Sequence, residues 1–476
     1  MRILSLFLIF AAASLPCAAK DTPTALTAVQ SQIQPGILSV LSDESQACIE
    51  CHRATTYGIY QQWGYSKHYG GNVGCYECHK AEKTDIDAFD HNGCLISIIV
   101  SPNDCGRCHK REVQEFTHSH HARAGEILGS LDNFLGEVVE GRAAAVSGCK
   151  QCHGAEVKVV GPGKLDPETW PNTGMGRLNP DGSRGSCSAC HTRHNFSSAQ
   201  ARQPENCGRC HLGPDHPQKE IYEESKHGVA YYGNIDKMNL NSPKWVLGED
   251  YSAAPTCATC HMSATPELPL THDVGDRISW TLRPAVSEKV DAPAIKAGKQ
   301  VKPWASRRAD MKKVCGVCHT PDWVESFYIQ YDNVVHLYNN KFAIPARDLI
   351  GALAEQGLVT KDIQFDDEIE WTYYFLWHHE GRRARMGASM FAPDYTQWHG
   401  FYEVADRFYM SLIPQAKELV EKARHNGKAD AAKKVEAEID KILNMPDHQW
   451  FLGKMPLEEK AKRTKAAGEF KKRYAQ

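Results

Sequence analysis

The stretch Arg202-Gln-Pro-Glu-Asn-Cys-Gly-Arg-Cys-His-Leu-Gly-Pro-Asp-His-Pro-Gln218 contains two cysteines that are separated by two residues and followed directly by a histidine. In this pattern two thiols can add to the vinyl groups of one haem, while the histidine becomes an axial ligand of the iron. The pattern occurs eight times. Its cysteine pairs are Cys48/Cys51, Cys75/Cys78, Cys105/Cys108, Cys149/Cys152, Cys187/Cys190, Cys207/Cys210, Cys257/Cys260 and Cys315/Cys318. Its histidines are His52, His79, His109, His153, His191, His211, His261 and His319. The sequence therefore predicts eight covalently bound c-type haems.

A disulfide or zinc framework is the alternative explanation, because paired cysteines in an exported chain usually form bridges or bind metal. Each of the eight pairs is nevertheless followed by histidine, and of 18 cysteines only Cys17 and Cys94 lie outside the pattern. Haem attachment accounts for this regularity, whereas a bridge framework does not. Residues 94–100 form a short apolar stretch that predicts a strand, and we expect Cys94 to be a buried thiol in it.

Residues 1–19 have the features of a secretory signal peptide. Arg2 supplies the positive charge, Ile3 to Ala13 the apolar segment, and Cys17-Ala18-Ala19 a small-residue cleavage site. This apolar segment is shorter than the roughly 20 residues that a spanning helix needs, and no later stretch comes closer. We therefore expect a periplasmic protein without a membrane span.

Charge excludes one class of partner. The chain has 55 Lys and Arg against 58 Asp and Glu, a formal net charge of -3, and haem propionates would make the holoprotein more acidic. Nothing in this balance points to nucleic acid. A small, partly basic electron acceptor is the partner that we expect.

The spacing of the motifs predicts the fold class. Successive motifs begin 20 to 58 residues apart, and segments this short cannot form independent cores, so the porphyrins must supply most of the apolar interior. Glycines and prolines divide the region into short helices. We predict a mainly α protein in which an octahaem cytochrome c domain with little regular strand, residues 20–340, precedes a region of long helices, residues 341–476.

The C-terminal region has apolar residues at helical spacing, which predicts helices over residues 366–383, 404–424, 431–443 and 457–473. It is also rich in large aromatic side chains: Trp371, Trp377, Trp398, Phe401, Tyr402 and Phe408. These helices either cover the haem core or pack against neighbouring subunits. The amount of aromatic surface favours assembly.

Fifteen histidines lie outside the eight motifs, which is enough to give most haems a second axial ligand. The candidates for this distal position lie in short polar or glycine-flanked segments: His68, His91, His118, His120, His121, His194, His227, His272 and His336. Any one of them can instead be an ordinary surface histidine. Two histidines on one iron leave it able only to pass electrons, so catalysis requires at least one haem with an open position.

Asp215-His216 lies four and five residues beyond His211, between two prolines. A carboxylate that fixes the tautomer of an adjacent imidazole suits proton transfer beside a haem substrate. The alternative is a distal ligand next to a helix cap.

Several longer motifs extend from about residue 45 to 455: Cys105-Gly-Arg-Cys-His109, Ser119-His-His-Ala-Arg-Ala-Gly125, Trp170-Pro-Asn-Thr-Gly174, Asn179-Pro-Asp-Gly182, Cys187-Ser-Ala-Cys-His191, residues 202–218 quoted above, His272-Asp-Val-Gly275 and His379-Glu-Gly-Arg-Arg383. With them the chain resembles the octahaem hydroxylamine oxidoreductase family. The resemblance implies a mostly helical homotrimer in which seven haems have two histidines. The fourth haem, bound here by Cys149, Cys152 and His153, would be the five-coordinate catalytic centre.

Asp215 and His216 match the active-site pair of that family, which takes up protons as hydroxylamine is oxidised. Oxidising members also bond the catalytic haem to a tyrosine of the neighbouring subunit. Tyr395 in Ala392-Pro-Asp-Tyr-Thr-Gln-Trp-His399 is the best match, ahead of Tyr402 and Tyr409. Electrons would leave through the other haems to a cytochrome or a quinone-linked membrane protein.

Three functions remain open from the sequence. The first is oxidation of hydroxylamine to nitric oxide or nitrite, with hydrazine oxidation as a related activity. The second is reduction of nitrite or hydroxylamine on the same scaffold without the tyrosine bond. The third, from a different class, is a non-catalytic electron conduit in which Asp215 and His216 have a structural role.

Overall fold

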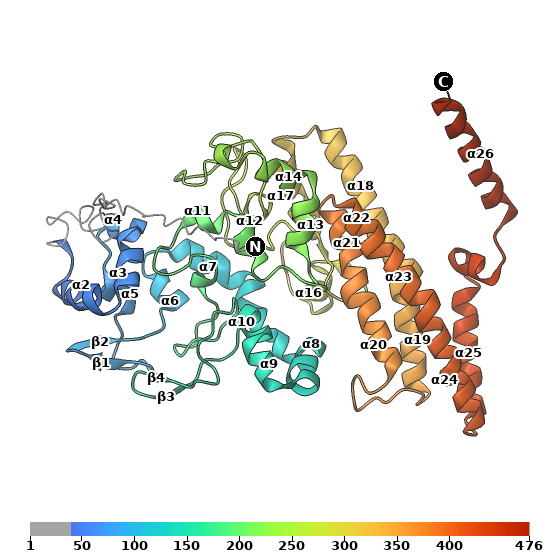
Figure 1. Cartoon of the computed structure of the whole chain (residues 1–476), viewed down its shortest axis with the longest axis horizontal. Coiled ribbons are helices and arrows are strands. Elements are labelled where there is room, and N and C mark those ends of the chain that lie inside the picture. Colours follow the sequence, from blue (N-terminus) through green and yellow to red (C-terminus); the bar gives the residue numbers. More distant parts are fainter. Residues whose placement is uncertain (1–39, 476) are drawn as a thin grey trace, which may run out of the picture.

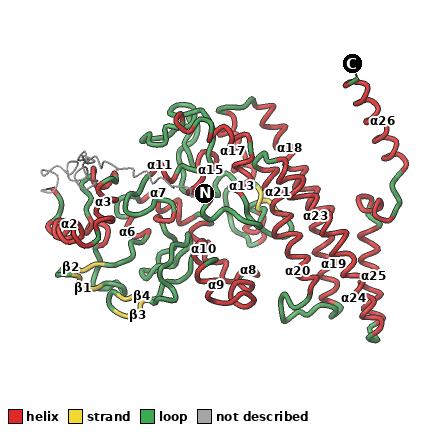
Figure 2. The backbone as a smooth tube through the Cα atoms, viewed as in Figure 1, coloured by secondary structure: helices red, strands yellow, loops and turns green. Residues whose placement is uncertain are grey.

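The computed structural model describes residues 40–475, so the predicted signal peptide, residues 1–19, lies outside the described part. Helices make up 59% of the described residues and strands 5%, which confirms the predicted mainly α class (Figure 1, Figure 2). The strands of the described residues form antiparallel pairs. They are β1 (Phe89–His91) with β2 (Cys94–Ile96), β3 (Val159–Gly161) with β4 (Lys164–Leu165), and β5 (Trp280–Thr281) with β6 (Glu288–Lys289).

The region that contains the motifs consists of short helices joined by loops (Figure 2). Its helices are α2 (Asp43–Thr55), α3 (Tyr57–Gly64), α4 (Lys67–Gly70), α5 (Cys75–His79), α6 (Pro102–Gly106), α7 (Lys110–His118), α8 (Leu131–Phe134), α9 (Arg142–Ser147), α10 (Cys149–His153), α11 (Ser198–Ala201), α12 (Pro204–Gly208), α13 (Gln218–Glu224), α14 (Lys226–Tyr232), α15 (Cys257–His261), α16 (Ala292–Lys296) and α17 (Trp304–Gly316). Local capping starts several of them: the Ser225 side chain accepts from the Gly228 N–H at the start of α14, and Thr256 caps α15. Such caps allow helices of a few residues where no large core supports them.

The predicted strand at residues 94–100 is shorter than expected, because pairing with β1 ends at Ile96. Cys94 is only half-buried, so the expectation of a buried thiol was wrong. The cause is its place at the first position of β2, directly after the turn at Asn92 and Gly93, both of which have positive φ.

Long helices dominate from residue 321 onwards. They are α18 (Pro321–Leu337), α19 (Ile344–Glu355), α20 (Glu368–Tyr374), α21 (Gly381–Ser389), α22 (Pro393–Thr396), α23 (Glu403–Asp406), α24 (Ile413–His425), α25 (Ala429–Leu443) and α26 (Leu457–Tyr474). One-turn π-helical segments join several of them end to end, so α18 and α19 form one helix over residues 321–355. The expected boundary between residues 340 and 341 lies inside this helix, which therefore belongs to both regions.

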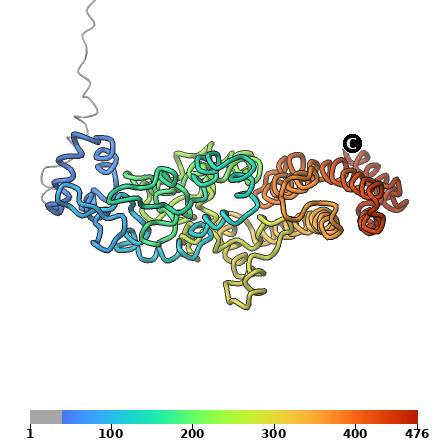
Figure 3. Tube along the Cα trace, turned by 90° about the horizontal axis from the view of Figure 1, so that it is seen from below, coloured from blue at the N-terminus to red at the C-terminus, as the bar shows by residue number. Residues whose placement is uncertain are grey.

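The C-terminal helices have a core of their own. Tyr338, Leu353, Leu376, Phe408 and Leu412 are fully or almost fully buried against one another, and the cluster continues into α25. These helices lie side by side at one end of the elongated molecule, with the haem-motif region at the other end (Figure 1, Figure 3). No helix among the described residues is both long and apolar enough to cross a membrane.

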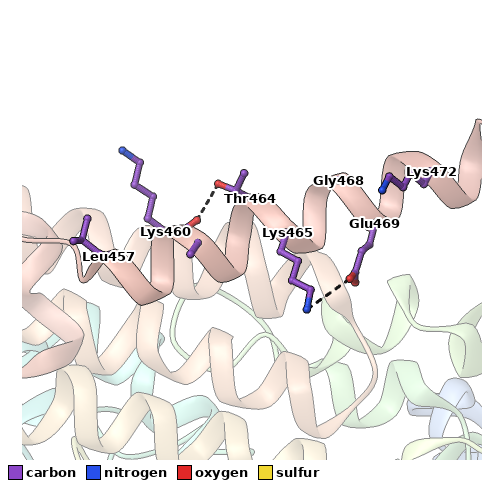
Figure 4. Close-up of a pocket in the computed structure, with 8 residues that line it drawn as sticks. Leu457, Lys460, Thr464, Lys465, Gly468, Glu469 and Lys472 are labelled. Carbon is purple, nitrogen blue, oxygen red and sulfur yellow. Dashed lines mark hydrogen bonds and ion pairs between the residues drawn. The ribbon is translucent and has the colours of Figure 1, made fainter.

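The last helix, α26, projects away from the rest of the chain (Figure 1). None of its side chains is buried, and Leu457 is 84% exposed. Figure 4 shows one side of the helix, where Thr464 donates to the Lys460 carbonyl and Lys465 faces Glu469. An isolated helix of this length is only marginally stable in water.

Candidate haem sites and active site

The motifs adopt the local geometry that haem attachment needs. In the motif that begins at Cys207, the His211 N–H donates to the Cys207 carbonyl at 3.0 Å, and the motifs at Cys105, Cys187 and Cys315 have the same bond. One such turn brings both thiols and the imidazole to one side of the backbone. None of the seventeen cysteines in the described residues forms a disulfide, so the thiols are free for thioether bonds.

The attachment cysteines differ in exposure. Cys51, Cys108 and Cys318 are exposed, whereas the other thirteen motif cysteines are half-buried. Each of the three is the second cysteine of its motif.

The cause of this exposure is the place of the three cysteines in the fold. Cys51 lies on α2, at the end of the molecule far from the C-terminal helices, and its Sγ is 4.0 Å from Thr55 Oγ1 of the same helix (Figure 1). Cys108 lies in the short turn between α6 and α7, and Cys318 lies in the turn between α17 and α18. A turn at the surface covers one side of a thiol only, so the sequence motif specifies attachment but not burial.

Six motif histidines face a second imidazole from a distant part of the chain. Two imidazoles that bind one iron at about 2.0 Å have ring centres roughly 6.3 Å apart, because each centre lies about 1.1 Å behind its nitrogen. The observed pairs are His52/His91 at 6.3 Å, His79/His194 at 6.4 Å, His109/His68 at 6.1 Å, His191/His272 at 6.5 Å, His211/His121 at 6.0 Å and His319/His227 at 6.1 Å. The spacing of these side chains therefore fits haem iron bound between them.

Two motif histidines, His153 and His261, have no distal-candidate imidazole at this separation among the described residues. Two of the predicted distal ligands, His120 and His336, likewise face no motif histidine in this way. The His336 ring packs edge-on against Trp280, with centres 5.5 Å apart, and His120 lies next to Gly275.

The remaining distal candidate, His118, also stands apart from the motif histidines. It is exposed, and its Nδ1 is 2.6 Å from the Gln114 carbonyl oxygen one turn earlier in α7. This local bond is typical of a surface histidine near the end of a helix, which is the alternative that the sequence left open.

Asp215 and His216 lie on the loop between α12 and α13. Asp215 Oδ1 is 2.7 Å from His216 Nδ1, and Asp215 Oδ2 is 3.4 Å from Nη1 of Arg382. Burial raises the pKa of Asp215, but the hydrogen bond and charge of His216 outweigh burial and hold that pKa at about 2. The carboxylate is therefore ionised near neutral pH and can stabilise a protonated His216.

The fourth motif lies near this pair, because Cys152 Sγ is 4.0 Å from the Arg209 carbonyl of the sixth motif. The His216 ring itself lies 6.1 Å from the His211 ring, the same spacing as in the six pairs above. Burial lowers the pKa of His153, and the charges of His216, Asp132 and Asp215 also act on its imidazole. The charge of His216 also acts on the Cys152 thiol. The structure thus brings the predicted acid–base pair to a motif whose histidine lacks an opposing imidazole from the distal candidates.

Three residues around this site were missed in the sequence analysis: Asp132, Tyr374 and His378. Arg382 belongs to a motif quoted there, but no role was assigned to it. Asp132 Oδ1 is 2.7 Å from His378 Nε2 and accepts a hydrogen bond of 2.9 Å from the Tyr374 hydroxyl. Asp132 is 242 positions from Tyr374 and 246 positions from His378 in the sequence, so no local sequence pattern indicates these contacts. Only the adjacent His379-Glu-Gly-Arg-Arg383 motif pointed to this part of the chain.

The three candidate tyrosines have different surroundings. Tyr395 is half-buried and packs against Ile221 and Met386 of its own chain. Tyr402 is 55% exposed. Tyr409 is buried, and its hydroxyl lies 2.7 Å from His448 Nδ1. Tyr395 and Tyr402 thus have side chains that a neighbouring subunit can reach more readily than Tyr409.

Comparison with known proteins defines the class. Residues 176–364 match the family described as seven times multi-haem cytochrome CxxCH, and residues 136–212 match cytochrome c7 and related cytochrome c. A solved structure described as a hypothetical multiheme protein is 26% identical, with a TM-score of 0.71 over 85% of this chain and 99% of that one. The matched part of the chain, residues 136–364, is thus similar to multihaem c-type cytochromes.

Two similar proteins are named after hydroxylamine oxidoreductase (HAO), the family that the longer motifs of the chain resemble. A probable nitrite reductase-hydroxylamine oxidoreductase fusion protein of Kuenenia stuttgartiensis is 30% identical over 247 aligned residues, which take in 45% of this chain and 25% of that protein. The chain thus matches a quarter of the length of this relative. A Kuenenia stuttgartiensis reducing HAO-like protein complex has the same fold, with 20% identity and a TM-score of 0.61 over 81% of this chain and 87% of that one.

Proposed function

We propose that the chain is an octahaem enzyme that oxidises hydroxylamine to nitric oxide or nitrite at the haem bound by Cys149, Cys152 and His153. One observation carries the proposal: His153 faces none of the candidate distal imidazoles among the described residues, yet the Asp215–His216 pair lies beside it. When bound, this haem supplies the iron site for the nitrogen substrate and takes up its electrons. Of the other seven haems, six have a pair of facing imidazoles, and all seven would pass these electrons on.

The protein's own part in this reaction is to move protons. The Asp215 carboxylate holds the Nδ1 proton of His216 and leaves Nε2 to take a proton from the substrate. Arg382 keeps Asp215 ionised from the other side, at 3.4 Å. A pair of this kind is expected to contribute about 10²- to 10⁴-fold to the rate.

Reduction of nitrite or hydroxylamine on the same scaffold is the second candidate. It is favoured by two relatives, one named as a nitrite reductase fusion and one as a reducing complex. Hydrazine oxidation and simple electron conduction have no such support.

We further propose that the protein is a periplasmic homotrimer assembled through its C-terminal helices. The projecting helix α26 and the exposed rings of Trp398 and Tyr402, whose centres are 5.3 Å apart, are surfaces that assembly would cover. Its redox partner would be a cytochrome or a quinone-linked membrane protein.

Two measurements on the purified holoprotein test the function. Hydroxylamine is offered with an oxidised cytochrome as acceptor, and nitrite is offered with a reduced dye as donor. The oxidising reaction predicts turnover in the first assay and haem-stained bands at three times the chain mass on a denaturing gel. Turnover in the second assay, with haem-positive monomer alone on the gel, would establish the reductive reaction instead.

A further inference from the structure

A second carboxylate and imidazole face each other across the haem-motif and C-terminal regions. Asp132 belongs to α8, and His378 lies in the π-helical segment between α20 and α21. Their contact of 2.7 Å joins two elements that pack together, since Leu131 and Leu135 lie against Phe365 and Tyr374. The His378 side chain is almost fully buried, with 2% of the residue exposed. The fold therefore encloses His378, whereas the Asp132 side chain is 28% exposed.

The orientation of His378 defines which nitrogen can act. Its Nε2 lies 2.7 Å from Asp132 Oδ1 and 3.2 Å from the Tyr374 hydroxyl oxygen, whose own proton is donated to Asp132. Both neighbours therefore favour the tautomer with the proton on Nε2. Its Nδ1 has no hydrogen-bond partner among the described residues. Burial lowers the pKa of His378, against the opposing effect of Asp132. Near neutral pH the imidazole is therefore neutral, with Nδ1 as a free proton acceptor.

Arg382 couples this pair to Asp215–His216. Its guanidinium lies 3.4 Å from Asp215, and its charge also acts on Asp132. Although burial raises the pKa of Asp132, the bonds from His378 and Tyr374 and the charge of Arg382 hold it below its ordinary value. Both carboxylates are therefore ionised together, and each can stabilise a protonated imidazole.

Tyr374 completes the arrangement. Burial and the charge of Asp132 raise the pKa of its hydroxyl, which stays protonated and donates to Asp132 at 2.9 Å. Its ring also stacks on the His378 ring, with centres 4.3 Å apart. Tyr374 thus fixes both members of the pair in place.

The segment that carries Asp132 contacts the fourth motif, because Gly136 lies against Cys149 Sγ. We propose that Asp132, His378 and Tyr374 form a second proton-transfer site for the haem at His153, in which His378 Nδ1 exchanges the proton while Asp132 and Tyr374 are positioning residues. This inference rests on the proposed function. Oxidation of hydroxylamine to nitric oxide releases three protons and three electrons, and oxidation to nitrite with one water releases five protons and four electrons. The electrons pass through the other haems to an oxidised cytochrome. Because one imidazole holds one proton at a time, a second pair lets consecutive protons leave by different groups; in the reductive direction the same groups would deliver them.

Cyanide gives a readout that does not depend on turnover. Hydrogen cyanide loses its proton when it binds ferric haem, so the rate of binding at an open haem reports on the local proton acceptor. The variants are His378→Gln, Asp132→Asn and Tyr374→Phe in the full holoprotein. His448→Gln is the matched control, because His448 is also buried and paired with a tyrosine, but in the C-terminal core.

We expect His378→Gln to slow both turnover and cyanide binding by about 100-fold, with unchanged c-type absorption. The pH dependence of binding should flatten, since Asp132, Tyr374, His379, Arg382 and Asp215 all act on this imidazole. Asp132→Asn should give a smaller loss in the same direction, Tyr374→Phe the smallest, and His448→Gln none.

Cyanide binding by His378→Gln at the wild-type rate and with the wild-type pH profile would overturn the inference. If His378→Gln does not fold, Asp132→Asn decides, because it keeps the shape of the side chain. The proposed function has a separate test. A wild-type protein that turns over neither hydroxylamine nor nitrite would refute it, while the rates of cyanide binding still test the role of His378 and Asp132.

Discussion

The two regions of this molecule differ in how their buried apolar side chains are arranged. In the haem-motif region, buried side chains form small separate clusters, such as Leu41, Ile49, Tyr60 and Trp63. In the C-terminal region, one continuous cluster extends from Tyr338 to Leu443 across successive helices. Area removed from water is the main stabilising term in folding. The first region must therefore take most of that area from its haems, whereas the second supplies its own.

The largest effect that we predict follows from this difference. A chain produced without haem attachment should lose the fold of residues 40–320 altogether, while the helices of residues 321–452 persist. Limited proteolysis with mass spectrometry should show a protected C-terminal fragment and no protected fragment from the motif region. Equal protection of both regions would contradict the comparison.

The same contrast explains what the sequence could predict. Haem attachment is encoded in five consecutive residues, so the motifs and the mainly α class were predicted from the chain alone. Four helical stretches of the C-terminal region were also located, because an apolar stripe at helical spacing is a local signal. The helix α19 (Ile344–Glu355) and the short α22 (Pro393–Thr396) were not predicted. The expected helix over residues 366–383 is continuous to Ser389, since a π-helical segment joins α20 to α21 instead of ending the helix.

The surroundings of these local motifs could not be predicted in the same way. His194 faces His79 across 115 positions of sequence, and nothing near either residue indicates the other. Asp132 and His378 were missed for the same reason. Neither lies in a recognisable motif of its own segment, and only the contact between them in the folded chain indicates a role. The exposure of Cys51 likewise depends on which elements pack over α2, and the sequence of its motif does not indicate those elements. Asp215 and His216 were found because both members of that pair are adjacent in the sequence.

A truncation in the C-terminal core should have the next largest effect. Leu412 is fully buried among the helices of this region, so Leu412→Ala should lower the free energy of unfolding by about 2–5 kcal/mol. Urea titration followed by far-UV circular dichroism measures the loss. The exposed Leu457 provides the control, and Leu457→Ala should change the value by no more than about 0.5 kcal/mol. A loss of Soret intensity that coincides with the loss of the helical signal would show that the two regions are less independent than proposed.

The Asp215 carboxylate provides a smaller, pH-dependent effect in the motif region. Its pKa is about 2 in the folded chain and about 3.9 in the unfolded chain. The unfolded state thus binds the proton first as the pH falls, so the stabilisation is present above about pH 4 and disappears as the pH falls towards 2. Asp215→Asn should therefore lower the free energy of unfolding by at most about 2 kcal/mol near neutral pH, and the two curves should meet near pH 2. Asp430→Asn, an exposed change on α25, should show no such convergence. A constant difference between wild type and Asp215→Asn at all pH values would mean that the carboxylate acts by shape alone.

Removal of α26 should have the smallest effect on folding and a distinct effect on assembly. A chain that ends at Gly453 loses no buried side chain, so its free energy of unfolding should stay within about 0.5 kcal/mol of the full chain at a concentration where both are monomeric. The helix carries Lys460, Lys462, Arg463 and Lys465 in one turn and a half, while the whole chain has a net charge of -3. Attachment to another copy should therefore weaken with added salt. Mass photometry of the full and shortened chains at low and high salt measures this directly. Identical mass distributions would assign assembly to the remaining C-terminal helices, and α26 would then have no part in holding the copies together.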